Sequence, residues 1–149
     1  MRMPFLALAF FLAAGSQSIA AQPAEQIAES PSRLLAEDVR VAIVAGDAQA
    51  WHDLIKWDGV DDITRAAIDR MTESVLGRAV ESVAIEPLDA ANYEPYEFKG
   101  VRYVLNGEPK GQVTVNFVPE PPLSQDSFTM AFGVEDGRAV ILLARPDGQ

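Results

Sequence analysis

The sequence predicts an α+β domain in which three N-terminal helices pack on one face of an antiparallel sheet of about five strands. Two observations support this fold class. Apolar residues recur at the helical period of 3.6 up to Gly77, and after it they alternate at the period of two that is typical of strands. Turn-forming residues separate the alternating segments, as in an antiparallel meander with helices gathered on one face.

The first 21 residues have the three parts of a secretory signal peptide. Arg2 supplies the positive start, an apolar run over residues 5–14 follows, and small residues lead to a cleavage region near Ala20 or Ala21. The apolar run is too short to cross a bilayer, which takes about 20 residues. The sequence therefore predicts a periplasmic or secreted protein with no membrane span after leader cleavage.

The chain after the leader divides into a tether and one domain. Residues 22–31 are polar, rich in Ala and Glu, and bounded by prolines, which predicts a flexible tether. Residues 32–149 then form a single α+β domain, since this length supports one hydrophobic core but not two ordinary ones.

Three helices are predicted at the start of this domain. The first begins near Ser32 and ends at Gly46, a natural helix stop, and Asp47 is a natural N-cap for the second, over residues 48 to about 56. The third runs from about residue 62 to 76. The apolar positions that define their buried faces are Leu35, Val39, Ala42, Ile43, Trp51, Leu54, Ile55, Ile63, Ala67, Met71 and Val75.

Five strands follow, each recognised by alternating apolar residues. They cover residues 82–86, 101–105, 113–118, 128–134 and 139–144. The last of these is apolar on both faces over residues 140–143, which is typical of an inner strand or of a strand covered on both sides.

The connections between these strands have their own signals. Residues 106–111 are dense in turn formers, and Asp136-Gly137 predicts a tight hairpin. The prolines at 119, 121 and 122 predict a stiff connection that cannot extend a strand ladder.

Composition excludes several classes of protein. Twelve basic and 22 acidic residues give a net charge of -10, which would repel nucleic acid and anionic membranes. The absence of cysteine excludes disulfides, thiolate zinc sites and cysteine nucleophiles. The sequence also lacks a glycine-rich phosphate loop and a Gly-x-Ser-x-Gly elbow. We therefore expect no nucleic-acid partner and no cofactor.

The stretch from Val41 to Ile55 resembles the start of proteins of the nuclear-transport-factor-2-like superfamily. An apolar helix ends in Ala45-Gly46-Asp47, a short helix follows, and Trp57-Asp58 stands at the place of an aromatic-Asp segment. The resemblance implies a cone-shaped fold in which helices fill the concave side of a strongly bent sheet, often leaving a pocket. It also implies that the function is either catalysis, as in isomerases, dehydratases and cyclases, or binding and dimerisation. No catalytic position can be carried over residue by residue.

Three residues are candidates for catalysis. His52 is the only histidine, so a histidine base or a Ser-His-Asp triad must use it. Asp58, which follows after a loop, is its candidate dyad partner. Tyr103, on a strand with one buried face, is a candidate proton donor. The alternative for His52 is a half-buried helix residue with a satisfied hydrogen bond.

Aromatic residues are the candidates for ligand binding. Tyr93 and Tyr96 flank Pro95 in a predicted loop, where aromatic side chains often contact a ligand. Trp57 is less tied to the core than Trp51, which shares a helix face with other apolar residues. The alternative for these aromatic residues is ordinary packing within the domain.

Asp58, Asp61 and Asp62 form the densest acidic cluster, but they lack the alternating ligand spacing of a calcium loop. Capping of the third helix by Asp61 or Asp62 explains the cluster more simply, so we expect no metal site.

Taken together, these features favour an exported, non-enzymatic domain that binds an unknown protein or a small apolar molecule. The alternative is a cofactor-free lyase or isomerase with Asp58 or His52 as general base in a cone-shaped pocket. A homodimer formed through the open sheet face is a third hypothesis.

Overall fold

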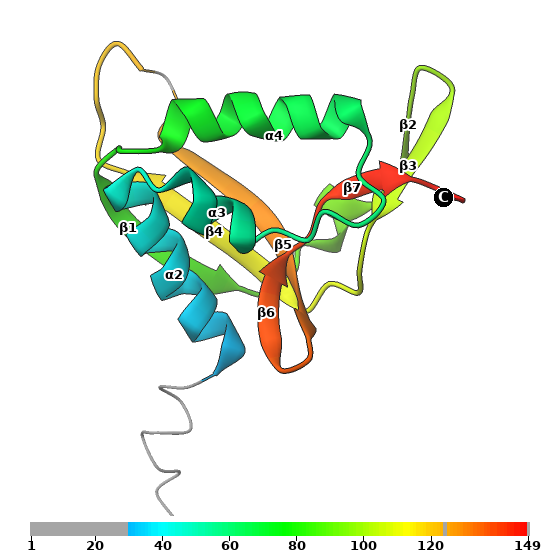
Figure 1. The fold of residues 1–149 in the computed structure, drawn as a ribbon, viewed down its shortest axis with the longest axis horizontal. Helices are drawn as coiled ribbons and strands as arrows, with labels where there is room; N and C mark the ends of the chain where they lie inside the picture. Colours follow the sequence, from blue (N-terminus) through cyan, green and yellow to red (C-terminus); the bar gives the residue numbers. More distant parts are fainter. Residues whose placement is uncertain (1–29, 124, 149) are drawn as a thin grey trace, which may run out of the picture.

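The computed structural model describes residues 30–123 and 125–148, which form three α-helices, one short 3₁₀ helix and seven strands in two sheets (Figure 1). The α+β class and the three helices are therefore confirmed. The predicted signal peptide and nearly all of the predicted tether lie outside the described residues.

The end of α2 and the starts of α3 and α4 lie where the sequence places their caps. Helix α2 covers Pro31–Ala45 and ends at Gly46, whose φ of 65° is the left-handed conformation of a helix stop. Helix α3 covers Ala48–Asp53, and the Asp47 carboxylate caps it by accepting from two backbone N–H groups. Helix α4 covers Asp62–Val75, and the Asp61 carboxylate accepts from the N–H of Thr64 at 2.9 Å.

Helix α3 is shorter than predicted, because it ends at Asp53 and not near Lys56. The chain becomes extended there in order to pair with a distant strand residue. The N–H of Ile141 donates to the carbonyl of Leu54 at 2.8 Å, and the N–H of Lys56 donates to the carbonyl of Ile141 at 2.9 Å. These two bonds replace the next helical turn.

The larger sheet has four antiparallel strands in the order β1-β4-β5-β6. Their bounds are Val80–Glu86, Gly111–Phe117, Ser127–Glu135 and Arg138–Ile141. The turn between β5 and β6 confirms the predicted hairpin, since Asp136 and Gly137 both have positive φ, at 49° and 77°.

The smaller sheet has three antiparallel strands in the order β2-β3-β7. Their bounds are Tyr96–Phe98, Val101–Leu105 and Ala144–Pro146, and the 3₁₀ helix η1 (Ala90–Tyr93) precedes them. In Figure 1 the β2–β3 hairpin projects beyond the body of the molecule.

The single sheet of about five strands was therefore a wrong prediction, as was the simple meander. Strand β2 has only three residues, too few for a periodic signal, and it lies in the segment predicted to be a loop. Strand β3 does not pair with β4, although the turn-rich residues 106–111 join them, because these residues cross from one sheet to the other. The predicted last strand divides into β6 and β7.

The main core lies between the helices and the larger sheet. Trp51 is almost fully buried there, as predicted, and its indole N–H donates to the Thr72 hydroxyl at 2.9 Å. Its ring meets Phe128 edge to face, at 6.0 Å between centroids. The other large, nearly fully buried side chains are Leu35, Val39, Ile43, Val75, Val113, Val115, Phe117 and Ile141.

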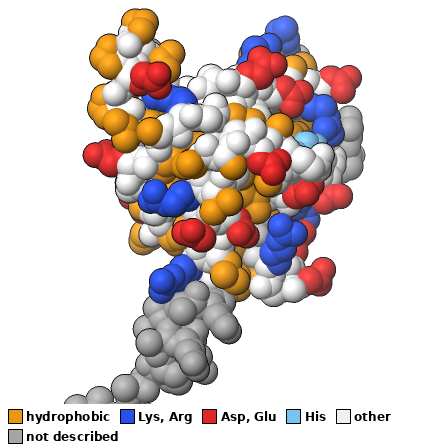
Figure 2. Space-filling view, turned by 60° about the vertical axis from the view of Figure 1, so that its left-hand side comes forward, with side chains coloured by type: hydrophobic (Ala, Val, Ile, Leu, Met, Phe, Trp, Pro, Cys, Tyr) orange, Lys and Arg blue, Asp and Glu red, His pale blue; other side chains and the backbone are white. Residues whose placement is uncertain are grey.

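The surface carries charges of both signs. Figure 2 shows acidic and basic side chains interspersed with hydrophobic ones over the face that it presents. The β2–β3 hairpin also exposes large apolar side chains. Because Phe98 pairs with Val101 and Tyr96 with Tyr103, these four residues share one face of the hairpin, and the first three are exposed.

The two sheets are joined by one bent segment, residues 138–146. Its first half pairs with β5 and its second half with β3. Backbone bonds continue across the bend, from the N–H of Leu142 to the carbonyl of Ala131 and from the N–H of Asn106 to the carbonyl of Leu143, each at 2.9 Å. The prediction of an inner strand is wrong, because β6 and β7 each lie at the edge of a sheet, whereas burial of Ile141, Leu142 and Leu143 agrees with the alternative of a segment covered on both sides.

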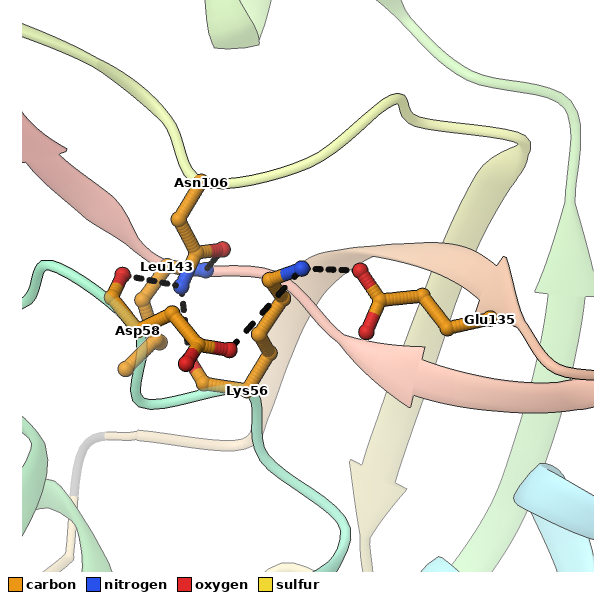
Figure 3. A network of polar contacts seen from close by, with 5 residues as sticks. All are labelled: Lys56, Asp58, Asn106, Glu135 and Leu143. Carbon is orange, nitrogen blue, oxygen red and sulfur yellow. Dashed lines mark hydrogen bonds and ion pairs between the residues drawn. The ribbon is translucent and has the colours of Figure 1, made fainter.

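Asn106 fixes the bend with its side chain (Figure 3). This buried amide accepts from the N–H of Leu143 at 3.0 Å and donates to the carbonyl of Lys56 at 2.7 Å. It also lies 3.3 Å from the carbonyl of Asp58. At the surface, the Lys56 ammonium forms ion pairs with Glu135 and with Asp58. The link after α3 is therefore tied to both sheets.

Candidate functional site

A cavity of about 270 Å³ lies where the N-terminal half of α4, helix η1, strand β5 and the smaller sheet meet. In Figure 1, α4 crosses the larger sheet with its N-terminal end toward the β2–β3 hairpin. The lining is mostly apolar. It comprises Thr64, Ile68, Asn92, Tyr93, Glu94, Tyr96, Tyr103, Val104, Leu105, Thr129, Met130, Ala131, Leu142, Leu143 and Ala144.

Three tyrosines reach this cavity from three different elements. Tyr93 ends η1, Tyr96 begins β2, and Tyr103 lies in the middle of β3. The register of the hairpin places Tyr96 opposite Tyr103, and their rings stack at 5.3 Å between centroids, inclined by 10°. Tyr103 is only 3% exposed, whereas Tyr96 is 51% exposed and so connects the cavity to the surface.

Tyr103 is held in place by Asp61. Its hydroxyl donates to the Asp61 carboxylate at 2.6 Å, a charge-assisted bond. This bond raises the pKa of Tyr103 to about 12, because it stabilises the protonated phenol. The same bond, followed by the N–H of Thr64, lowers the pKa of Asp61 from its ordinary value. At neutral pH the pair is therefore a neutral phenol and a carboxylate.

The other two tyrosines also lie near negative charge. Burial raises the pKa of Tyr93, and the carboxylate of Asp89 raises it further. Burial likewise raises the pKa of Tyr96, with an added contribution from Asp61. All three phenols thus stay protonated well above neutral pH, and each lies in the field of a nearby carboxylate.

Three of the residues that we singled out from the sequence lie outside the lining of this cavity. His52 is exposed at the end of α3 and stacks on Trp57, at 4.5 Å between ring centroids. The guanidinium of Arg65 lies over the Trp57 ring, 4.6 Å from its centroid. Asp58 is exposed and faces the Lys56 ammonium at 3.9 Å. His52 is more exposed than the half-buried position that its helix face predicts.

Asp61 is the functional candidate that sequence reasoning did not single out. Its predicted role was helix capping, which the structure confirms. Its second role, as partner of Tyr103, joins residues 42 positions apart, and no local pattern signals such a contact. Asn92 and Glu94, which flank Tyr93, were also missed. Their position beside two aromatic residues in a connecting segment was the only available signal.

No helix within residues 30–123 and 125–148 is both long enough and apolar enough to span a membrane. Over the same ranges, no group of three or more acidic or histidine side chains comes together in a way that could hold a metal ion.

Compared with protein-family models, with curated proteins and with solved structures, the chain matches none of them.

Proposed function

We propose that this chain is a non-enzymatic ligand-binding domain of an exported protein, and that it binds a small, largely apolar molecule in the cavity between α4 and the smaller sheet. The observation that carries this proposal is the cavity of about 270 Å³ itself, which has a mostly apolar lining and a few polar groups. Such a composition is typical of small-molecule sites. Export rests on the predicted signal peptide, and the cone-shaped, nuclear-transport-factor-2-like relationship remains part of the proposal.

The side chains around the cavity favour binding over acid–base catalysis. A general base works best with a pKa near the operating pH, whereas the hydrogen bonds from Tyr103 and Thr64 lower the pKa of Asp61. Tyr103, with its pKa raised to about 12, is a correspondingly weak proton donor. The alternative of a lyase or isomerase based on His52 or Asp58 has less support, because neither residue lines the cavity.

The test is a titration of the purified chain with two neutral probes, tert-butylbenzene and 2-naphthol, followed through backbone amide chemical shifts. We expect saturable shifts in strand β5 around residues 129–131 and in residues 142–144, since both segments line the cavity. Saturation at other residues, or no saturation with either probe, contradicts the proposal.

Two variants that fill the cavity supply the control. Ala144→Phe adds a ring from β7, and Thr64→Leu puts a larger side chain on α4, so the space is reduced from two different elements. Each variant should raise the dissociation constant of the probe by about tenfold or more, because the ligand and the new side chain compete for one volume. Ala67→Phe, at an exposed position of α4, should leave binding unchanged.

A further inference from the structure

We propose that the natural ligand of this cavity is a small organic cation, an amine or a quaternary ammonium group carried on an apolar body. This inference rests on the proposed function, since it takes the cavity as the ligand site. Three observations carry it: the aromatic lining, the sign of the charge in the lining, and the way in which the polar donors of the lining are already used.

The aromatic lining consists of tyrosines. Tyr93, Tyr96 and Tyr103 bring three phenol rings to one small space. The face of an aromatic ring carries partial negative charge and attracts a cation, and groups of such rings are the usual means of holding alkylammonium ligands. An entirely aliphatic lining would hold an apolar ligand equally well, so the rings add a preference for positive charge.

The charge at the cavity is negative. Among the described residues that line it, Glu94 is the only charged one. The Asp61 carboxylate, which is not itself part of the lining, accepts the hydrogen bond of the Tyr103 hydroxyl at 2.6 Å. Two basic residues neighbour the lining along its strands, Arg102 next to Tyr103 and Arg145 next to Ala144. The Arg102 guanidinium pairs with Asp147 at 3.5 Å, and the Arg145 side chain packs beside Gly59.

Two polar donors of the lining, those of Tyr103 and Asn92, are directed at the protein's own carboxylates. The Tyr103 hydroxyl donates to Asp61, and the Asn92 amide donates to Asp89 at 3.0 Å. The Glu94 carboxylate, by contrast, is an acceptor. A ligand that brings positive charge or N–H donors therefore complements this cavity better than a ligand that brings an anionic or carbonyl group.

The test uses two probes of the same shape, phenyltrimethylammonium and tert-butylbenzene, which differ in one atom, a cationic nitrogen in place of carbon. Dissociation constants for both are measured with the purified chain through amide chemical shifts. We expect the cation to bind about tenfold more tightly at low salt, and this preference to decrease as salt is added.

Charge-neutralising variants locate the source of this preference. Glu94→Gln and Asp61→Asn each remove one carboxylate, and asparagine retains the ability to cap α4. Each should reduce the preference for the cation by about threefold or more while the binding of tert-butylbenzene changes little. Glu97→Gln is the matched control. It removes the same charge next to Tyr96, but on the opposite face of the β2–β3 hairpin, and should leave the preference intact.

The outcomes separate this inference from the proposed function. Equal binding of both probes, or tighter binding of tert-butylbenzene, overturns the inference and leaves the cavity as a ligand site. A preference for the cation that survives both Glu94→Gln and Asp61→Asn also overturns it. If neither probe binds, the proposed function fails together with the inference.

Discussion

The phenol of Tyr103 donates a hydrogen bond of 2.6 Å to the carboxylate of Asp61, and this bond ties the smaller sheet to the first turn of α4. It crosses one side of the cavity and determines the charge state of both partners. The same carboxylate caps α4 through the N–H of Thr64. The Asp61 side chain therefore both holds a tyrosine of the cavity lining and caps helix α4.

Stability at alkaline pH reports on Tyr103. Its pKa is raised from 10 to about 12 in the folded chain, so its contribution is fully present below pH 10 and is lost as the pH rises toward 12. Urea denaturation at a series of pH values should show stability falling across this window. In Tyr103→Phe the fall should be shallower, with a remainder from Tyr93 and Tyr96. Identical slopes in the two proteins would contradict this account.

Stability at acid pH reports on Asp61. Because its pKa is lowered in the folded chain, its contribution is present above the ordinary value of 3.8 and is lost as the pH falls through the lowered pKa. Tyr103→Phe should bring the pKa of Asp61 back toward the ordinary value, since the largest cause of the shift is removed. Titration of the Asp61 carboxyl carbon by NMR measures the change directly. The carboxyl of Glu86 serves as an internal reference, because hydrogen bonds from Thr114 and Gln112, and not from a tyrosine, lower its pKa.

Two aspartate caps allow a matched comparison. Asp47→Ala removes only a cap, at the start of α3, and should cost about 1 kcal/mol. Asp61→Ala removes both a cap and the acceptor of a nearly buried phenol, and so should cost more. Thermal and urea denaturation of the two variants provide the comparison. An equal loss would mean that the bond to Tyr103 contributes nothing to stability.

The amide of Asn106 is expected to be the most sensitive polar group at the junction of the sheets. Asn106→Ala leaves the buried N–H of Leu143 without its acceptor and the carbonyl of Lys56 without its donor, which should cost about 2–3 kcal/mol. Asn116→Ala removes a single bond of 3.0 Å to the Ser82 hydroxyl, and should cost about 1 kcal/mol or less. The free energies of unfolding of both variants test this order.

Gly111 is a position where a methyl group has no room. A Cβ there would lie 2.9 Å from the carbonyl oxygen of Glu86 and 2.9 Å from the ring of Phe132. Gly111→Ala should therefore destabilise the chain by about 1–3 kcal/mol. Gly107→Ala is the control, because its Cβ would meet only the end of the flexible Leu142 side chain. A smaller loss at Gly111 than at Gly107 would show that the strands adjust easily.

The features that the sequence predicted correctly are those encoded locally. Gly46 and Asp47 end one helix and start the next, and Asp136-Gly137 turns one strand into its neighbour, because each residue carries its own conformational preference. The burial of Trp51 follows from its position on an apolar helix face.

The features that were missed depend on partners far apart in the sequence. Strand β1 pairs with β4, with two other strands between them in the chain, and alternation alone does not specify a partner. The pairing of Ile55 with Ile141 ends α3 earlier than its apolar pattern predicts. In the same way, the alternating pattern placed Tyr103 on a strand with one buried face, but nothing in the sequence identified Asp61 as its hydrogen-bond partner.

The direct pairing of β1 with β4 has a consequence for how this protein could change over evolutionary time. Residues 87–110, which include η1, β2 and β3, form an excursion between two strands that are neighbours in the larger sheet. Insertions and replacements are tolerated best in segments outside the main ladder and core. Because Tyr93, Glu94 and Tyr96 belong to the part of this excursion that precedes the buried Tyr103 and Asn106, that part could diverge and alter ligand preference while the four-stranded scaffold is retained. For the same reason, residues 93–98 are the natural segment to randomise when the cavity is redesigned for a new ligand.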